Sequence, residues 1–304
     1  MAENVLIIGS GCAGLSAAIY TAREGFQPLV IAGSISGGQL MLTTTVENYP
    51  GFPSGVQGPE LIELMRKQAE RFGAKMVYED VMDVDFSSKP FKISTGPNTY
   101  EANSVIIATG ANAKLMGLES ETKYMGKGVS TCGTCDGPFF KNKDVIVVGG
   151  GDTAMEDSEF LTKFAKSVTI VHRKDSFKAS KVMQDKVLSN PKIKVVWNST
   201  VQEILGDGTH VNGATIKDVN TGTLTNIPID GVFVAIGHTP NTTFLKGKLN
   251  VDARGFLVVK DEVLSDIEGV FIAGDVSDPF YKQAATAAAS GVKAALHVRE
   301  YLNK

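Results

Sequence analysis

The chain has 304 residues, of which 43% are hydrophobic and 21% charged, and its formal net charge is −3. This length favours about two domains with sizeable cores, and the absence of a basic excess argues against a nucleic-acid partner. The first residues lack the basic start and apolar run of a signal peptide, and no apolar run approaches the roughly 18 residues of a membrane span. We therefore expect a cytoplasmic protein with neither a nucleic-acid nor a membrane partner.

The chain begins with the pattern strand, glycine turn, helix, strand. Residues 5–8 and 28–31 are short apolar runs typical of buried parallel strands, and the Ala-rich residues 15–23 predict a helix. This context strengthens the GxGxxG motif that lies between the first strand and the helix.

The motif consists of Gly9, Gly11 and Gly14. The first glycine permits a tight turn, the second lets the backbone approach a pyrophosphate, and the third lets helix and strand pack closely. An acid that binds a ribose is expected about 20 residues later, but Ala32 and Gly33 stand there. We interpret the motif as a dinucleotide site, with an ordinary glycine turn as the alternative.

The next stretch predicts a loop, a helix and a set of strands. Residues 37–53 form a polar, turn-rich loop that either carries ligand contacts or only connects elements. Residues 59–72 carry an apolar stripe at helical spacing, and residues 75–100 read as antiparallel strands. A buried strand at 105–110 ends in small residues, and we expect a domain boundary near 112–118.

Two cysteines separated by two residues, Cys132 and Cys135, are followed directly by Asp136. Such a pair exchanges electrons, ligates a metal or forms a structural bridge. One pair is too few for a four-cysteine zinc site, and none of the four histidines lies near it in sequence. Redox chemistry is therefore the favoured interpretation, and we expect no metal.

The pattern of the first unit then repeats. A strand at 144–148, a glycine turn at 149–154, a helix at 157–166 and a strand at 167–171 follow one another. After this second strand come His172, Arg173, Lys174 and Lys178 in place of an acid. Positive charge at this position suits a 2′-phosphate and favours NADP over NAD, unless the cluster is simply a solvated surface.

The remainder predicts a meander at 195–227, buried strands at 230–237 and 270–275, and a helix at 282–302. The simplest topology returns the last segment to the first unit. We predict an α/β protein with two Rossmann-like dinucleotide-binding domains of the three-layer ββα type, the second inserted in the first. The first domain would comprise residues 1–115 and 243–304, and the second residues 116–242.

With these motifs, the sequence resembles the low-molecular-weight thioredoxin reductases over nearly its whole length. The most specific features are residues 132–136, the turn at 149–154 with the basic residues after it, and Gly274 and Asp275 followed by residues 282–284. The resemblance implies FAD in the first domain, NADPH in the inserted one, a homodimer, and thioredoxin as the disulfide substrate. The missing ribose-binding acid is usual in this family.

Motifs and resemblance together indicate the following cofactor-binding residues. In the first domain they are Gly9, Ser10, Gly11, Ala13, Gly14, Gly38, Gln39, Leu40, Thr44, Asn48, Ala108, Thr109, Gly110, Gly274, Asp275, Lys282, Gln283 and Ala284. In the second they are Gly149, Gly151, Asp152, Thr153, Ala154, His172, Arg173, Lys174, Lys178, Ile236 and Gly237.

The family pattern also implies roles for the predicted catalytic residues Cys132, Cys135 and Asp136. A flavin suits the middle of the electron path because it accepts hydride and reacts with thiols. Cys135 would face the flavin, and Cys132 would attack the partner through a mixed disulfide. We assign Asp136 as the general acid that protonates the departing thiolate, with a helix N-cap as the alternative role.

Several residues depart from the family pattern. Cys12 stands where proline is usual, as an extra redox group or, in our preferred interpretation, as a small buried residue. Lysines 174, 178 and 282 replace arginines, which keeps the charge but loses the bidentate fork and could soften the NADP preference. Gly133 replaces alanine between the thiols, where we expect more backbone freedom and unchanged chemistry.

Two further expectations concern partners and motion. Phe139 and Phe140 follow the dithiol and would either dock a protein partner or belong to the core. In the family the inserted domain rotates, and its hinges would lie near 112–118 and 238–244. The alternative functions are a flavoprotein that reduces another disulfide protein or a peroxidase partner, and a redox-regulatory flavoprotein.

Overall fold

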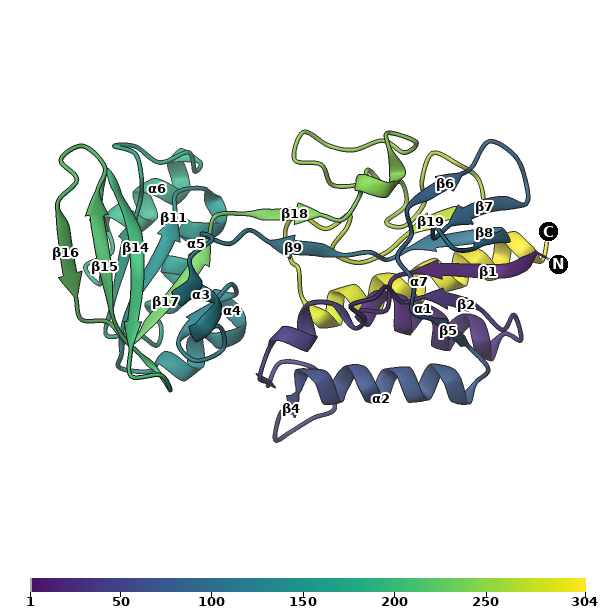
Figure 1. The fold of residues 1–304 in the computed structure, drawn as a ribbon, viewed down its shortest axis with the longest axis horizontal. Helices are drawn as coiled ribbons and strands as arrows, with labels where there is room; N and C mark the ends of the chain where they lie inside the picture. The colour runs from purple at the N-terminus through teal and green to yellow at the C-terminus, as the bar shows by residue number, and fades with distance from the viewer. Residues whose placement is uncertain (1) are drawn as a thin grey trace. The chain divides into compact units, whose positions relative to one another are not determined.

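The computed structural model describes residues 2–304, which form two compact units (Figure 1). Unit 1 comprises Met1–Asn112 and Thr239–Lys304, and unit 2 comprises Ala113–His238. The crossings were expected three to four residues later, at 115/116 and 242/243. They fall earlier because each lies within a short strand, β9 (Ala111–Ala113) or β18 (His238–Pro240), and these two strands pair with each other.

Unit 1 is built on a seven-stranded sheet whose central strands run parallel in the order β5-β2-β1-β8-β19. The antiparallel strands β7 and β6 extend the sheet beside the first half of β8. The expected antiparallel meander over 75–100 is wrong for β5, which pairs in parallel with β2. The strands are β1 (Glu3–Ile8), β2 (Leu29–Ile31), β5 (Lys75–Val77), β6 (Asp83–Asp85), β7 (Phe91–Ser94), β8 (Thr99–Ile107) and β19 (Val270–Ile272).

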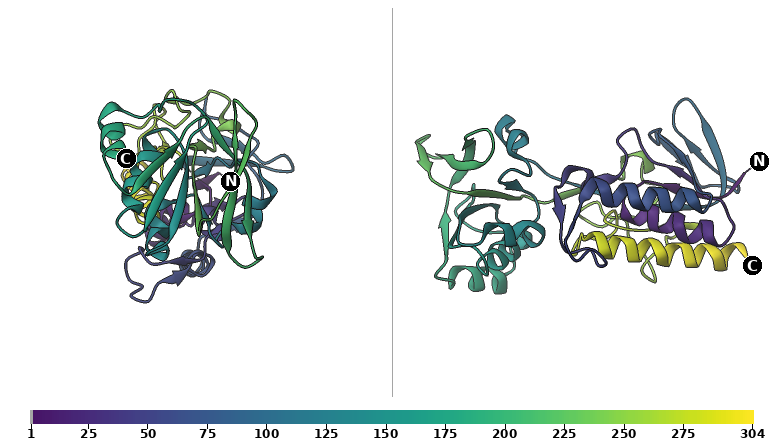
Figure 2. Two further views of the ribbon diagram at one scale, coloured as in Figure 1. Left: turned by 90° about the vertical axis from the view of Figure 1, so that its left-hand side faces the viewer. Right: turned by 90° about the horizontal axis from the view of Figure 1, so that it is seen from below.

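Three helices cover one face of this sheet: α1 (Cys12–Arg23), α2 (Gly58–Arg71) and α7 (Ala284–Leu302). Helix α1 lies between the other two (Figure 2). Side chains alternate along β1, so that Val5 and Ile7 pack with the alanines of α1 and α7. The small residues allow close approach, because a Cβ built on Gly291 of α7 would lie 2.1 Å from the Ala13 carbonyl oxygen.

The opposite face of the unit 1 sheet is covered by other strands and loops. Leu6 and Ile8 of β1 pack there with residues of β6 and β7 and with the returning segment that holds Leu245 and Leu257. The unit therefore has three layers, as predicted. Its shorter elements are η1 (Gly38–Leu42), β3 (Thr45–Val46), β4 (Val56–Gln57) and η3 (Thr243–Leu245).

Unit 2 repeats this plan with a five-stranded parallel sheet in the order β10-β17-β11-β12-β13. Val145 and Val147 face a helical layer, and Ile146 and Val148 face the antiparallel sheet β14-β15-β16. The strands are β10 (Val129–Ser130), β11 (Asp144–Gly149), β12 (Ser167–Val171), β13 (Ile193–Val196), β14 (Ser199–Gly206), β15 (Val211–Asp218), β16 (Leu224–Ile227) and β17 (Gly231–Ala235).

The helices of unit 2 are α3 (Glu119–Tyr124), α4 (Gly133–Asp136), η2 (Gly137–Phe140), α5 (Asp152–Leu161) and α6 (Lys181–Leu188). The helix expected at 157–166 begins and ends earlier, as α5. It ends at Leu161 because Lys163 and Phe164 donate to carbonyls three residues back, which tightens the chain into turns. Two Rossmann-like ββα units confirm the predicted fold class. None of the helices within residues 2–304 combines the length and apolarity needed to cross a bilayer.

Candidate functional site

The first glycine turn connects β1 to α1 as predicted. Gly9 has a φ of +112°, and a Cβ there would lie 2.2 Å from the carbonyl oxygen of Ala108. A Cβ on Gly14 would lie 2.0 Å from the carbonyl oxygen of Gly9. Backbone conformation and packing therefore require glycine at both positions.

Gly11 is different, because neither its backbone conformation nor its neighbours require a glycine. Its φ is −75°, and the nearest atom to a Cβ there would be the carbonyl oxygen of Gly37, 4.0 Å away. The open space lies at the N-terminus of α1, where unpaired N–H groups favour an anion. Close approach of a ligand phosphate accounts for a glycine that the protein itself does not need.

Several predicted residues of unit 1 lie close to this turn. Gly9, Ala108 and Gly274 follow the carboxyl ends of the parallel strands β1, β8 and β19, the edge where such sheets bind ligands. A Cβ on Gly274 would lie 2.8 Å from that of Ala13. The remaining predicted residues of this unit lie in the loops after β1 and β8, in the first turn of α1, in η1 and its flanking loop, and at the start of α7. They are Ser10, Gly14, Gly38, Gln39, Leu40, Thr44, Asn48, Thr109, Gly110, Lys282, Gln283 and Ala284.

Hydrogen bonds tie these loops together. Ser10 Oγ donates to the Ala32 carbonyl oxygen (2.9 Å) and accepts the N–H of Gly37 (2.9 Å). Asn48 Nδ2 donates to Gln283 Oε1 (3.2 Å), which joins the 43–53 loop to the start of α7. Ser10 and Asn48 therefore connect the loops that contain the predicted cofactor-binding residues.

Asp275 lies where a bound ligand would complete its hydrogen bonding. Its Oδ1 is buried and has no hydrogen-bond partner among residues 2–304. Burial, with a smaller contribution from Asp278, raises the pKa of this carboxyl to about 6, and Lys282 opposes the shift. A buried carboxylate oxygen without a partner is costly, and the hydroxyl groups of a ribityl chain would satisfy it.

Cys12 belongs to the packing of this unit. Its thiol is buried with Leu15, Val46 and Leu61. Burial and the nearby Asp275 raise the pKa of the thiol to about 12. A protonated, enclosed thiol is inert, so the structure supports the small buried residue over the extra redox group.

The second glycine turn shows the same contrast between its glycines. Gly149 has a φ of +156°, and a Cβ there would lie 2.4 Å from the Ala235 carbonyl oxygen and 2.8 Å from the Ala154 Cβ. Gly151 has a φ of −98° and no atom within 4 Å of a Cβ position. This turn too leaves room for a phosphate at a helix N-terminus, that of α5.

The predicted basic residues follow β12 beside this turn. Arg173, Lys174 and Lys178 are exposed, and the Lys178 N–H donates to the carbonyl oxygen of Gly150 (2.8 Å). None of the three forms an ion pair with another residue of the described chain. Their charge is therefore available to an anion.

His172 differs from its neighbours because it is buried. Its Nε2 lies 3.0 Å from the Ser176 carbonyl oxygen. Its ring is tilted against Phe177 and lies edge-on to Trp197. A Cβ on Gly150 would lie 2.2 Å from the His172 ring. The His172 ring therefore packs directly against the backbone of Gly150 in the glycine turn. The other predicted residues of this unit line α5 and the end of β17, and they are Asp152, Thr153, Ile236 and Gly237.

Cys132 and Cys135 form a disulfide at the start of the short helix α4. The Cys135 N–H donates to Cys132 Sγ at 3.2 Å, so the outer sulfur caps the helix. Both cysteines are partly exposed. Of the aromatic pair that follows, Phe140 is core and packs edge-on against Phe233, whereas Phe139 is 41% exposed.

Asp136 ends α4 and is largely enclosed. Burial raises its pKa, and a hydrogen bond from Ser130 opposes the shift. Its side chain makes no capping hydrogen bond to the following η2 helix, which argues against the N-cap role. A carboxyl that retains its proton more readily than usual suits a general acid.

Ser130 is a site residue that sequence reasoning missed. Besides its bond to Asp136, its Oγ accepts the N–H of Cys132 (3.0 Å) and contacts the Cys132 carbonyl oxygen (3.3 Å). The available signal was a small polar residue two positions before the dithiol. Among residues 2–304 no group of three or more His, Cys, Asp or Glu side chains is placed to hold a metal.

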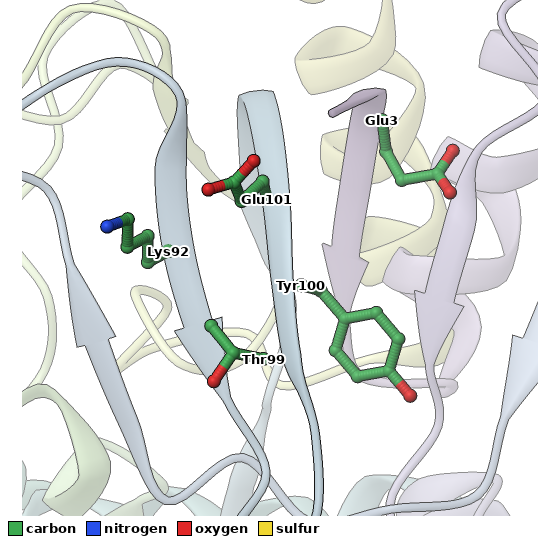
Figure 3. Close-up of a pocket in the computed structure, with 5 residues that line it drawn as sticks. All are labelled: Glu3, Lys92, Thr99, Tyr100 and Glu101. Atoms are coloured by element: carbon green, nitrogen blue, oxygen red, sulfur yellow. The ribbon is translucent and has the colours of Figure 1, made fainter. Parts of the chain in front are cut away.

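A surface hollow of about 360 Å³ in unit 1 is unrelated to these residues (Figure 3). Figure 3 shows its lining of Glu3, Lys92, Thr99, Tyr100 and Glu101. Glu3 begins β1, so the hollow lies at the opposite end of this strand from Gly9. Parallel sheets bind ligands at the carboxyl ends of their strands, and the hollow is therefore not the nucleotide site.

The comparisons with known proteins agree with this geometry. The family model of pyridine nucleotide-disulphide oxidoreductases matches residues 3–291. The thioredoxin reductase of Rickettsia typhi is 51% identical over 305 residues, covering 99% of this chain and 98% of its own. That of Streptomyces coelicolor is 49% identical over 303 residues, covering 99% and 94%. Among solved structures, thioredoxin reductase from Giardia duodenalis has a TM-score of 0.95 at 41% identity and 99% coverage of both chains.

The chain therefore belongs to the pyridine nucleotide-disulphide oxidoreductases and, within them, to the low-molecular-weight thioredoxin reductases, as the sequence predicted. Its activity requires a flavin and a nicotinamide nucleotide.

Proposed function

We propose that this chain is an NADPH-dependent thioredoxin reductase that passes two electrons through FAD and the Cys132–Cys135 pair to the disulfide of thioredoxin. The observation that carries the proposal is a partly exposed disulfide followed by an enclosed carboxyl, in the same unit as a nucleotide turn. The overall reaction consumes NADPH, one proton and the thioredoxin disulfide, and it yields NADP⁺ and the thioredoxin dithiol.

Unit 1 would hold FAD. The space over Gly11 at the N-terminus of α1 suits its pyrophosphate, and Asp275 Oδ1 suits a ribityl hydroxyl. Asn48 and Gln283, which bond to each other, would flank the ring system. When bound, FAD takes a hydride from the nicotinamide and supplies two electrons to a disulfide.

Unit 2 would hold NADPH. The space over Gly151 suits the pyrophosphate, and the unpaired charges of Arg173, Lys174 and Lys178 suit the 2′-phosphate. A nicotinamide dinucleotide without that phosphate would leave these charges unused. NADPH is therefore the proposed donor, although two lysines stand where the family has arginines.

Cys132, Cys135 and Asp136 would carry out the steps after reduction of the flavin. Cys135 would receive the electrons, and Cys132 would attack a sulfur of thioredoxin, forming a mixed disulfide and releasing one thioredoxin thiolate. Cys135 then attacks Cys132, restores the enzyme disulfide and releases the second thiolate. Asp136 would supply a proton to a departing thiolate, and the exposed Phe139 would contact the partner protein.

The test is an anaerobic titration of the flavin-loaded protein with NADPH, followed by addition of oxidised thioredoxin. Flavin absorbance should bleach and then return within seconds. A Cys132→Ser variant should bleach but fail to recover. If the flavin of the unaltered protein stays reduced with thioredoxin and recovers with another disulfide protein or a peroxidase partner, the alternative substrate replaces thioredoxin. A homodimer and a cytoplasmic location remain predictions, which sedimentation and fractionation of cells would test.

A further inference from the structure

The backbone between the two thiols lies against a buried carboxylate. Gly133 is the first residue of α4 and is buried, and α4 packs against α5. Asp157 lies within α5 and is only 8% exposed. The sequence suggested that Gly133 adds backbone freedom, but the space beside it is filled by this side chain.

The fit is tight enough to couple the two residues. A Cβ on Gly133 would lie 2.5 Å from Asp157 Oδ1, 2.8 Å from its Cγ and 3.0 Å from its Cβ. The carboxylate could swing away from a methyl group, but the Asp157 Cβ is fixed to the helix. The absence of a side chain at residue 133 therefore makes room for the aspartate.

The other acids near this turn differ from Asp157 in position or in burial. Asp136 is the other acid at this turn. On α5, Asp152 and Glu156 are exposed and Glu159 pairs with Lys186, while β10 and η2 carry no titratable side chain. Asp157 is thus the buried acid that faces the turn from a neighbouring element.

We propose that Asp157 is a positioning residue of the dithiol, whose side chain takes the place of a residue-133 side chain and fixes the turn that carries both thiols. The proposal deepens the proposed function, since it assumes that Cys132 and Cys135 are the working pair. Its tests use no thioredoxin, so they can fail independently of the substrate assignment.

The first test measures the thiols of the flavin-loaded protein after anaerobic reduction by NADPH. Asp157→Ala empties the space beside Gly133, so the turn should be held less firmly and alkylation of the thiols by iodoacetamide should quicken several-fold. Adding Gly133→Ala, which refills the space, should bring the rate back toward that of the unaltered protein, and Glu156→Ala, at the adjacent exposed acid, should not change it. An unchanged rate in Asp157→Ala, or an equal change in Glu156→Ala, would overturn the positioning role.

The second test is a double-mutant cycle on the same flavin-loaded protein, read as urea unfolding of the oxidised form. Gly133→Ala should destabilise the unaltered protein and cost much less beside Asp157→Ala, because the methyl then fills the vacated space. We expect the coupling to change the unfolding equilibrium constant about tenfold. Additive effects would show that the two residues are independent and would overturn the positioning role.

Discussion

The reactivity of each of the three cysteines depends on its burial and on the charged groups near it in the folded protein. Cys12 is enclosed beside Asp275, and both features raise its pKa, whereas the dithiol cysteines are partly exposed. After reduction, two thiols should therefore react rapidly with a thiol reagent and the third only after unfolding. Cys12→Ala should retain nearly full turnover. A third rapid thiol in the native protein, or loss of turnover in Cys12→Ala, would restore the redox role for Cys12.

Asp275 illustrates a residue that is unfavourable without its ligand. Its pKa is raised to about 6, above the value in an unfolded chain. The charged form is therefore disfavoured in the folded protein, and the resulting destabilisation develops as pH rises above about 4 and is complete above about 6.

Asp275→Asn should consequently stabilise the flavin-free protein at pH 7–8 by about 1–3 kcal/mol, with no difference below about pH 4. The same change should weaken retention of FAD, because the amide is a poorer acceptor for hydroxyl groups. Chemical unfolding of the flavin-free proteins at several pH values measures the first effect, and flavin release on dilution measures the second. Equal stabilities at pH 8 would contradict the explanation.

Asp136 is the proposed general acid of the dithiol site, and Ser130 is hydrogen-bonded to it. Asp136→Asn should lower thioredoxin-dependent turnover about 100-fold while FAD remains bound. Ser130→Ala removes the hydrogen bond that opposes the raised pKa of Asp136. The alkaline limb of the pH profile of turnover should therefore move to higher pH in Ser130→Ala. In Ser130→Thr, which keeps a hydroxyl group, the limb should stay in place. Wild-type-like turnover of Asp136→Asn would remove this residue from the mechanism.

At the scale of elements, the loop after β12 would set the proposed preference for NADPH. Arg173, Lys174 and Lys178 are exposed and unpaired, whereas His172 packs beneath Gly150. Removing one surface charge, as in Lys174→Ala, should raise the KM for NADPH several-fold, or about 1 kcal/mol, and leave the KM for NADH unchanged. Lys181→Ala, a lysine of α6 paired with Asp185, is the control. Equal effects on both nucleotides would contradict a 2′-phosphate contact.

The sequence predicted those elements that depend only on residues close together in the chain. The glycines at 9, 14 and 149 meet steric demands of a strand–turn–helix unit, and the apolar runs of β1 and β11 predicted buried parallel strands. Contacts between residues of different elements could not be predicted in this way. Nothing in the sequence places Asp157 against Gly133, or Ser130 against Asp136, because these pairs depend on how α5 and β10 pack beside the dithiol. The parallel pairing of β5 was missed for the same reason.

At the scale of the whole molecule, the positions of the proposed sites imply motion. The dithiol and the turn proposed to bind NADPH both belong to unit 2. Under the proposed function, each would have to meet the flavin that unit 1 would hold. Two short strands, β9 and β18, are the covalent crossings between the units. We therefore expect unit 2 to change its orientation during each cycle, with the bending near these strands.

Solvent viscosity tests this motion without any partner protein. In anaerobic stopped-flow with two equivalents of NADPH, the first loss of flavin absorbance records hydride transfer from the nicotinamide. The later phase, in which the dithiol receives electrons and the flavin is reduced again, should slow in proportion to viscosity because it requires rearrangement of the units. A Cys135→Ser variant should show only the first phase. If the later phase of the unaltered protein does not respond to added sucrose, reorientation does not limit electron transfer to the dithiol.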